Sequence, residues 1–317
     1  MKANVINRFL TVILTLGLFF YSNCTHVPVQ TSTPPTPVKS EENTVASPSY
    51  TNEPLFSSLE NQLIADSVDA NLVQSIYQNP AVKLEPYIIA SNLKRSEKAL
   101  DYSQFLTDAS VLKAKNYLHE HRVSLKKASK KFGVSPSIVV AILTVETELE
   151  TNNGRYPTIN VLSTMAVAGN PQVQEKIFSF LGDKTNDPEL KKQVLASLKQ
   201  RVERGYRELK FLLTYLEKNH VDPLSVKGSV EGAIGIPQFM PSNIGHYGQD
   251  GDGDGTVDLF NHADAIASIA YFLHEHKWKE ARTVEEKKKV LLYYNRSIYY
   301  VDTVWLLAER LKQNTKK

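Results

Sequence analysis

From Ser229 to Ile244 the chain reads Ser-Val-Glu-Gly-Ala-Ile-Gly-Ile-Pro-Gln-Phe-Met-Pro-Ser-Asn-Ile, and an acidic run, Asp-Gly-Asp-Gly-Asp-Gly-Thr-Val-Asp-Leu-Phe, follows from Asp250 to Phe260. Glycine permits positive φ and close backbone approach, whereas proline fixes φ and removes a hydrogen-bond donor. A connector between two helices does not need so rigid a loop, but a binding site does, because binding residues concentrate on loops held by a scaffold. The stretch therefore predicts a ligand site, against the simpler interpretation of a turn-rich connector.

The composition of the whole chain sets only broad limits on its class. The 317 residues are 42% hydrophobic, enough to bury a sizeable core, and the net charge is +3. This nearly neutral balance gives no argument for nucleic acid as a partner. Cys24 is the only cysteine, which excludes a disulfide framework and a thiolate zinc site.

The N-terminus has the pattern of an export signal. Lys2 and Arg8 precede a short apolar run from Phe9 to Tyr21, which is typical of a signal peptide over residues 1–23. The cysteine directly after it resembles the lipidation site of bacterial lipoproteins, so we expect Cys24 to carry a lipid anchor. Asn23 departs from that pattern, and cleavage elsewhere with a free thiol is the alternative. The chain is thus expected to be exported to the cell envelope or periplasm.

Beyond the signal peptide the chain divides into a tether and a helical part. Residues 24–54 are rich in Pro, Ser and Thr and predict a flexible tether, since they offer little apolar surface to bury. From residue 55 onward apolar residues recur at three- and four-residue steps, which predicts a mainly α domain over 55–317, with N-terminal helices over 55–133 and a core over 134–317. The expected helices are Leu55–Asn79, Val111–Lys131, Pro188–Asn219, Ala263–His276, Val284–Tyr294 and Tyr300–Leu311.

One further helix carries a candidate acid. Ser135 and Pro136 are typical of a helix start, and the sequence continues as a nearly apolar run with glutamates at positions 146, 148 and 150. At about 100° per residue, Glu146 falls inside the apolar arc while Glu148 points away. A carboxyl group among aliphatic side chains has a raised pKa and can act as a general acid. A solvated helix end with scattered glutamates is the alternative.

Several short motifs then follow one another in a fixed order. The motifs are Val145-Glu146-Thr147, Lys227-Gly228-Ser229, Gly232-Ala233-Ile234-Gly235, Gln238-Phe239-Met240-Pro241-Ser242, the acidic run, Asp264-Ala265-Ile266-Ala267-Ser268-Ile269-Ala270 and Tyr293-Tyr294-Asn295-Arg296-Ser297. Each motif alone is weak, but the ordered set from about Val134 to Leu307 resembles the membrane-bound lytic murein transglycosylase B family.

The resemblance implies a lysozyme-like α-helical fold that cleaves the MurNAc-β-1,4-GlcNAc bond of peptidoglycan without water and leaves 1,6-anhydro-MurNAc ends. A single glutamate serves first as acid and then as base, unlike the two-carboxylate scheme of ordinary glycosidases, and Glu146 occupies the matching position. The resemblance requires no cofactor, and we expect a monomer. It assigns substrate contacts to Ser229, Gln238, Phe239, Tyr294, Asn295 and Tyr300. Phe239 and Met240 could equally fill the core, and Tyr293 and Tyr299 fit plain helix packing better.

Two residues depart from the family pattern. Glu150 stands where the family usually has Gly, and Glu231 replaces a small residue in the loop of Ser229–Gly235. Either glutamate could crowd the groove or raise the pKa of Glu146 through like charge.

The acidic run resembles a calcium-binding EF-hand loop. Its positions one, three and five are aspartates and position six is Gly255, but position twelve is Asn261 instead of a bidentate Glu. The family resemblance includes a calcium site here, so we expect a structural Ca²⁺ held by oxygen atoms, and a metal-free turn that caps the next helix is the alternative. The candidate ligands are Asp250, Asp252, Asp254, Thr256 through its carbonyl, Asp258 through water, and Asn261.

Two other functions stay open at this point. A hydrolytic muramidase would need a water-binding Asp, which the sequence does not identify. A non-catalytic peptidoglycan-binding lipoprotein would keep the groove without turnover, and the retention of Glu146 beside Ser229 and Gln238 argues against it.

Overall fold

A computed structural model describes residues 53–94, 101–149, 154–182 and 186–313. The signal peptide, the lipidation of Cys24, nearly all of the tether and Glu150 lie outside these residues. The first helix begins at Glu53, two residues before the predicted start of the helical domain.

The described chain is mainly α, as predicted. In the first half the elements are α1 (Glu53–Ala65), α2 (Ala70–Tyr77), α3 (Pro86–Lys94), the 3-10 helix η2 (Tyr102–Leu106), α4 (Asp108–Glu120), α5 (Arg122–Phe132) and α6 (Pro136–Thr147). In the second half they are β1 (Tyr156–Pro157), α7 (Thr158–Ala166), α8 (Pro171–Leu181), α9 (Pro188–Asn219), β2 (Lys227–Gly228), α10 (Pro241–Tyr247), α11 (His262–Glu275), α12 (Val284–Tyr294) and α13 (Ile298–Lys312). The strands β1 and β2 pair antiparallel, with Tyr156 opposite Gly228.

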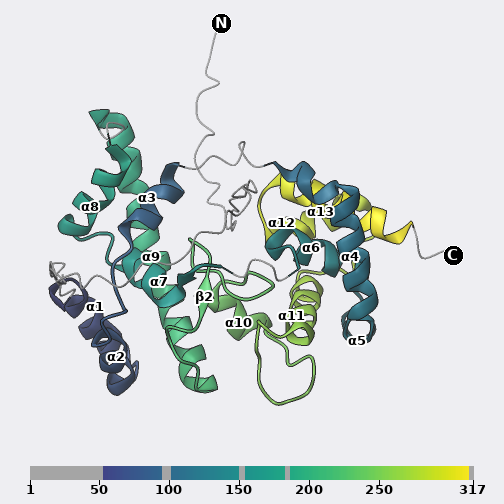
Figure 1. Cartoon of the computed structure of the whole chain (residues 1–317), viewed down its shortest axis with the longest axis horizontal. Helices are drawn as coiled ribbons and strands as arrows, with labels where there is room; N and C mark the ends of the chain where they lie inside the picture. The colour runs from purple at the N-terminus through teal and green to yellow at the C-terminus, as the bar shows by residue number, and fades with distance from the viewer. Residues whose placement is uncertain (1–52, 95–100, 150–153, 183–185, 314–317) are drawn as a thin grey trace, which may run out of the picture.

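The helices form two groups with the 229–260 stretch between them (Figure 1). One group contains α1, α2, α3, α7, α8 and α9, and in it α9 packs against α7 while α3 packs against α8. The other contains α4, α5, α6, α11, α12 and α13, and in it α6 packs against α13 and α4 while α5 packs against α11. The short helix α10 contacts α9 in the first group and α11 in the second. The loop with the Gly and Pro residues is therefore supported from both sides.

Helices α9 and α12 have the bounds that the sequence predicts, but two expected helices are each broken in two. The first breaks after Ala65, where Ser67 has a φ of 68° and the Asp69 side chain accepts a hydrogen bond from Leu72 N (2.8 Å) to start α2. The second breaks at His121, which lies between α4 and α5. Helices α7, α8 and α10 were not predicted, because each is short and α7 is buried along almost its whole length.

Helix α6 lies at the centre of its group. Pro136 is its first residue, as predicted, and every side chain from Ser137 to Thr147 is buried. Helix α6 therefore has no solvated face along this stretch, and both α13 and α4 pack against it. Among the described helices none is by itself long and apolar enough to cross a membrane, and α5 and α6 meet those limits only as a pair bent by 116°.

Candidate active site

Glu146 is a buried carboxyl group at the C-terminal end of α6. Its side chain is 6% exposed, and the alternative of a solvated helix end is wrong. Burial raises the pKa of Glu146 to about 8, because the charged form loses its hydration, and the Tyr300 hydroxyl lowers that pKa by a smaller amount. No other described carboxylate contributes to the shift. At neutral pH this group therefore holds its proton.

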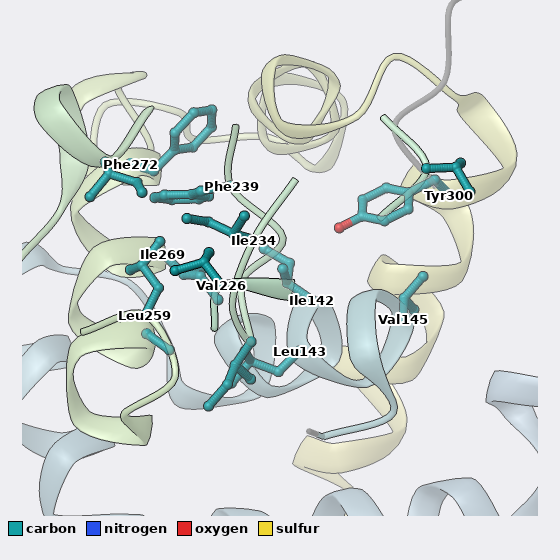
Figure 2. Close-up of a cluster of buried hydrophobic side chains, with 14 of the residues drawn as sticks. Ile142, Leu143, Val145, Val226, Ile234, Phe239, Leu259, Ile269, Phe272 and Tyr300 are labelled. Atoms are coloured by element: carbon teal, nitrogen blue, oxygen red, sulfur yellow. The ribbon is translucent and has the colours of Figure 1, made fainter. Parts of the chain in front are cut away.

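Two tyrosines from the α12–α13 segment stand beside this acid. Figure 2 shows the Tyr300 ring extending from α13 over α6, with its hydroxyl directed towards the interior. That hydroxyl stabilises the Glu146 carboxylate without the geometry of a full hydrogen bond. Tyr294 is stacked on Tyr300 at 6.4 Å between ring centroids and donates a hydrogen bond to the Pro237 carbonyl (2.6 Å). Burial and the nearby Glu146 raise the pKa of both tyrosines, so both stay protonated and can donate.

The loop from Ser229 to Met240 is the second component of the candidate site, because it contacts the neighbour of the acid on α6 and Tyr294. The Ser229 Oγ accepts hydrogen bonds from the N–H groups of Glu231 (3.3 Å) and Ala233 (3.1 Å). The Gln238 amide donates to the Gly235 carbonyl (2.9 Å), and Gln238 itself has a φ of 51°, which a non-glycine residue adopts only when its surroundings impose it. Both side chains are therefore fixed by the loop's own backbone.

Direct contacts join this loop to the elements that carry the acid. The Thr147 hydroxyl, next to Glu146, donates to the Ile236 carbonyl (3.2 Å), and Tyr294 donates to Pro237. Gly232 and Gly235 have positive φ values, and a Cβ at either would lie 2.5 Å from Leu162 or Leu259. Here the glycines serve both of the purposes proposed from the sequence, since they permit the turn and the close packing.

The predicted sugar contacts do not all face open space. Phe239 is 1% exposed and packs on Phe272 and Tyr294, with ring centroids 5.8 and 5.9 Å apart, so it fills the core (Figure 2). This burial favours the second of the two interpretations given from the sequence, in which Phe239 fills the core, over a direct contact with the substrate. Tyr300 is also fully buried. Its hydroxyl lies near the Glu146 carboxyl and is not exposed to solvent.

Asn295 keeps a free donor at the end of α12. Its side-chain oxygen accepts from Ser297 N (3.0 Å), while its buried Nδ2 has no hydrogen-bond partner among the described residues. A buried donor without a partner costs stability unless a ligand satisfies it. This side chain is therefore a candidate for binding a ligand oxygen.

Glu231 does not raise the pKa of Glu146, which was one of the two effects considered from the sequence. Its fully buried carboxylate pairs with the guanidinium groups of Arg201, at 2.5 Å, and Arg204, both on α9. Arg201 also donates to Asn92 of α3 (2.7 Å). Burial lowers the pKa of each arginine to about 10, and both remain charged. Sequence reasoning missed this cluster, although two arginines three positions apart on an otherwise apolar helix face are a signal for it.

The acidic run places its first three aspartates close together. The carboxylates of Asp250, Asp252 and Asp254 each offer an oxygen within 4.8 Å of the others. Asn261 makes two hydrogen bonds within the protein. Its amide nitrogen donates to Asp252 (2.7 Å), and its side-chain oxygen accepts from Ala263 N (2.8 Å) and so caps α11. Asn261 thus caps α11, as expected of a metal-free turn, and the three aspartates also form a cluster of carboxylates that can bind a metal ion.

Of the remaining predicted ligands, Thr256 bonds to Asp254 of this cluster while Asp258 lies outside it, and one supporting residue was missed. Thr256 and Asp258 are exposed, and the Asp258 side chain accepts from Phe260 N (2.8 Å). Asp264, buried in α11, accepts from the N–H groups of Gly251 and Asp258, both at 2.7 Å, and so holds both ends of the loop. An Asp three positions after the Asn N-cap is the signal that could have identified it.

These features define a class: a mainly α protein in which one buried, protonated carboxyl group lies beside a rigid Gly/Pro loop. Residues 51–290 match the family described as Transglycosylase SLT domain. Because this match covers more than half of the chain, the chain belongs to that family, and the resemblance found in the sequence is confirmed.

Individual relatives agree with this assignment. Over 175 residues the chain is 30% identical to membrane-bound lytic murein transglycosylase B of Escherichia coli (strain K12), a stretch that covers 55% of this chain and 40% of that relative's length. The solved structure of soluble lytic transglycosylase SltB1 from Pseudomonas aeruginosa matches at a TM-score of 0.65 with 22% identity, over 81% of this chain and 97% of that one.

A second solved structure shares the fold at a similar level. Escherichia coli Slt35 in complex with calcium matches at a TM-score of 0.64 with 21% identity, covering 82% of this chain and 93% of that one. At these identities the solved structures show a common fold.

Proposed function

We propose that this protein is a lytic transglycosylase that cleaves the MurNAc-β-1,4-GlcNAc bond of peptidoglycan and leaves 1,6-anhydro-MurNAc ends. The observation that carries the proposal is the buried Glu146, whose pKa of about 8 keeps it protonated at neutral pH. A general acid must be protonated before it meets its substrate, and a pKa near the working pH lets the same group act as base afterwards. Family membership supplies the reaction class.

In the first step the Glu146 carboxyl donates its proton to the glycosidic oxygen as the bond to the MurNAc anomeric carbon breaks. The Tyr300 hydroxyl, which lies near the carboxyl, stabilises the carboxylate that forms. In the second step the carboxylate accepts the proton of the MurNAc 6-hydroxyl, whose oxygen attacks the anomeric carbon and closes the anhydro ring. Glu146 is protonated again at the end, and no water is consumed.

Polar groups of the 229–240 loop and of the end of α12 would hold the sugar in place. Asn295 Nδ2 is a buried donor without a partner among the described residues, and it can bind a substrate oxygen. Ser229 and Gln238 present a hydroxyl and an amide whose positions the loop fixes. The two fragment complexes known for a relative of the same fold, Pseudomonas aeruginosa SltB3 with NAG-anhNAM-pentapeptide and with NAG-NAM-pentapeptide, are consistent with such a glycan substrate.

A structural Ca²⁺ is proposed for the acidic loop. The three clustered carboxylates of Asp250, Asp252 and Asp254 are hard oxygen donors of the kind that Ca²⁺ prefers, with the Thr256 carbonyl as a further ligand. When bound, the ion would tie the loop together and thereby steady α10 and α11. The test is thermal unfolding with Ca²⁺ and with EDTA. Ca²⁺ is expected to raise the Tm by about 2–4 °C, an effect of roughly 1 kcal/mol that is absent in Asp252→Asn, and a Tm independent of Ca²⁺ would remove the proposal.

We also propose that the protein is exported and lipid-anchored in the cell envelope through Cys24, where it acts as a monomer. The relative from Escherichia coli is described as membrane-bound, and the apolar run before Cys24 has the form of a signal peptide. Metabolic labelling with a fatty acid tests the anchor, because the label should be lost in Cys24→Ser.

The reaction itself is tested by mass analysis of digested sacculi. The wild type should release 1,6-anhydro-muropeptides, Glu146→Gln should release none, and Glu203→Gln, which alters an exposed glutamate on α9, should behave as the wild type. Products with reducing MurNAc ends would instead identify a hydrolytic muramidase. Binding to sacculi without any product would identify a non-catalytic protein.

A further inference from the structure

Helix α5 concentrates positive charge that the overall composition conceals. Its eleven residues contain five cations, Arg122, Lys126, Lys127, Lys130 and Lys131, and no acidic residue. The net charge of the chain is +3, so the rest of the chain without these five cations carries −2. All five side chains are exposed, which places a strongly basic face on a protein that is otherwise slightly acidic.

The five cations divide into two sets. Lys127 donates to the Gly251 carbonyl (2.7 Å) and Lys131 to the Gln249 side chain (3.3 Å), so these two face the acidic loop. Arg122, Lys126 and Lys130 follow one another at four-residue steps and lie within about 80° of the helix circumference. None of these three makes an ion pair or hydrogen bond with a described residue, and Glu120, the acidic residue next to them in sequence, makes none either.

An apolar depression lies among these three cations. Its volume is about 370 Å³, and it is lined by Leu118, Leu125, Pro136 and Ser129 together with the stems of the three basic side chains. On the same face Val123 is 72% exposed, about 20° around the helix from Lys130. The lining contains no aromatic ring and a single hydroxyl, which does not suit a sugar, whereas aliphatic stems below cationic heads suit an amphiphile with a negative head group.

We propose that this basic α5 face docks on an anionic phospholipid bilayer. Arg122, Lys126 and Lys130 would contact the phosphate head groups while Val123 and the apolar depression meet the upper acyl region. Charge complementarity carries the proposal, since basic clusters next to apolar side chains bind acidic lipid surfaces and each cation near such a surface strengthens binding by roughly a factor of five. The contact is independent of the proposed reaction and of the anchor at Cys24.

The test is co-sedimentation of the chain from residue 25 to 317 with vesicles at low salt. This chain lacks the signal peptide and Cys24 and keeps every described helix, hence the whole described core. We expect it to bind vesicles that contain phosphatidylglycerol and not pure phosphatidylcholine. The triple variant Arg122→Gln, Lys126→Gln, Lys130→Gln should weaken that binding by on the order of 100-fold, because three such contacts are lost.

A matched control separates this face from the total charge. Lys192→Gln, Lys199→Gln and Lys218→Gln together remove the same three charges from exposed positions on α9, and they should change vesicle binding only slightly. Equal weakening by both triple variants, binding that does not depend on acidic lipid, or a loss of sacculus binding in place of vesicle binding would overturn the proposal. Both variants should release anhydro-muropeptides at the wild-type rate from solubilised glycan, so a failure of the proposed reaction would be seen separately.

Discussion

Two of the buried glutamates in the described chain, Glu231 and Glu146, have opposite surroundings. Glu231 is fully buried and meets two arginines of α9, whereas Glu146 is buried in α6 with no cation among the groups that shift its pKa. The first carboxylate pairs with two guanidinium groups and ties the 229–240 loop to α9. The second keeps its proton up to a pH of about 8.

The contrast separates a structural carboxylate from a chemical one. A buried charge with good partners fixes the position of its surroundings, although it adds little net stability. Burying a carboxyl without a counterion destabilises the fold, and groups with such strongly shifted pKa values cluster at functional sites. In this chain the paired glutamate holds the loop in place, and the unpaired one is the buried acid next to Thr147, whose hydroxyl bonds to that loop.

The largest expected effect is on turnover. Glu146→Gln keeps the size and a hydrogen-bonding group but removes the transferable proton, so kcat should fall by about 10³-fold. Measured with the same glycan substrate, Glu231→Gln should lose much less, because its carboxylate holds the loop and does not touch the reaction. An equal fall of kcat in the two variants would show that Glu146 and Glu231 do not have separate chemical and structural roles.

The next effect is on the fold. Glu231→Ala leaves Arg201 and Arg204 buried without their counterion, and the free energy of unfolding should drop by about 3–5 kcal/mol. Denaturant unfolding measures this, with Glu203→Ala on the exposed side of α9 as the control. A loss below about 1 kcal/mol would show that the ion cluster is solvated and does not secure the loop.

For Glu146 the effect on stability has the opposite sign. Its folded pKa of about 8 lies above the ordinary value of 4.5, so the folded chain binds the proton more tightly than the unfolded chain. The stability from this proton is complete below pH 4.5 and is lost as pH rises towards 8. The Glu146→Gln side chain never ionises. The free energy of unfolding of this variant should therefore rise relative to that of the wild type between pH 4.5 and 8, by roughly 3 kcal/mol at pH 7. Parallel stability curves from pH 4.5 to 8 would contradict this.

A smaller effect sharpens the role of Tyr300. Its hydroxyl lowers the pKa of Glu146 by favouring the carboxylate, so Tyr300→Phe should raise that pKa. The alkaline fall of kcat/KM, which follows deprotonation of the acid, should move to higher pH, and kcat should drop by about tenfold because the carboxylate loses the stabilisation by this nearby hydroxyl. Tyr299→Phe, at an exposed neighbouring position, should leave the profile unchanged.

The sequence predicts elements well where a local signal decides them. Helix α9 begins at Asp187-Pro188 and α12 at a capping box of Thr283 and Glu286, and both were placed correctly. The breaks at Ser67 and at His121 have no Gly or Pro to mark them, so only the tertiary packing reveals them. Helix α7 was missed because it is buried along almost its whole length and shows no polar stripe.

The candidate site also combines features that a local sequence signal predicts with features that depend on tertiary packing. The burial of Glu146 could be predicted from its place in a run of aliphatic residues, but the partner of Glu231 could not, because Arg201 lies 30 positions away and the ion pair depends on how α9 packs. For Phe239 the sequence left a sugar contact and a place in the core equally open, and the packing of Phe272 and Tyr294 around its ring favours the core.

The most direct test is a pH titration of the Glu146 side-chain carboxyl by carbon-13 NMR, with the resonance assigned by its absence in Glu146→Gln. Burial without a counterion predicts a midpoint near pH 8, shifted upward in Tyr300→Phe. A midpoint near the ordinary value of 4.5 would show that the carboxyl is ionised at neutral pH, and Glu146 could not then be the acid that starts the reaction.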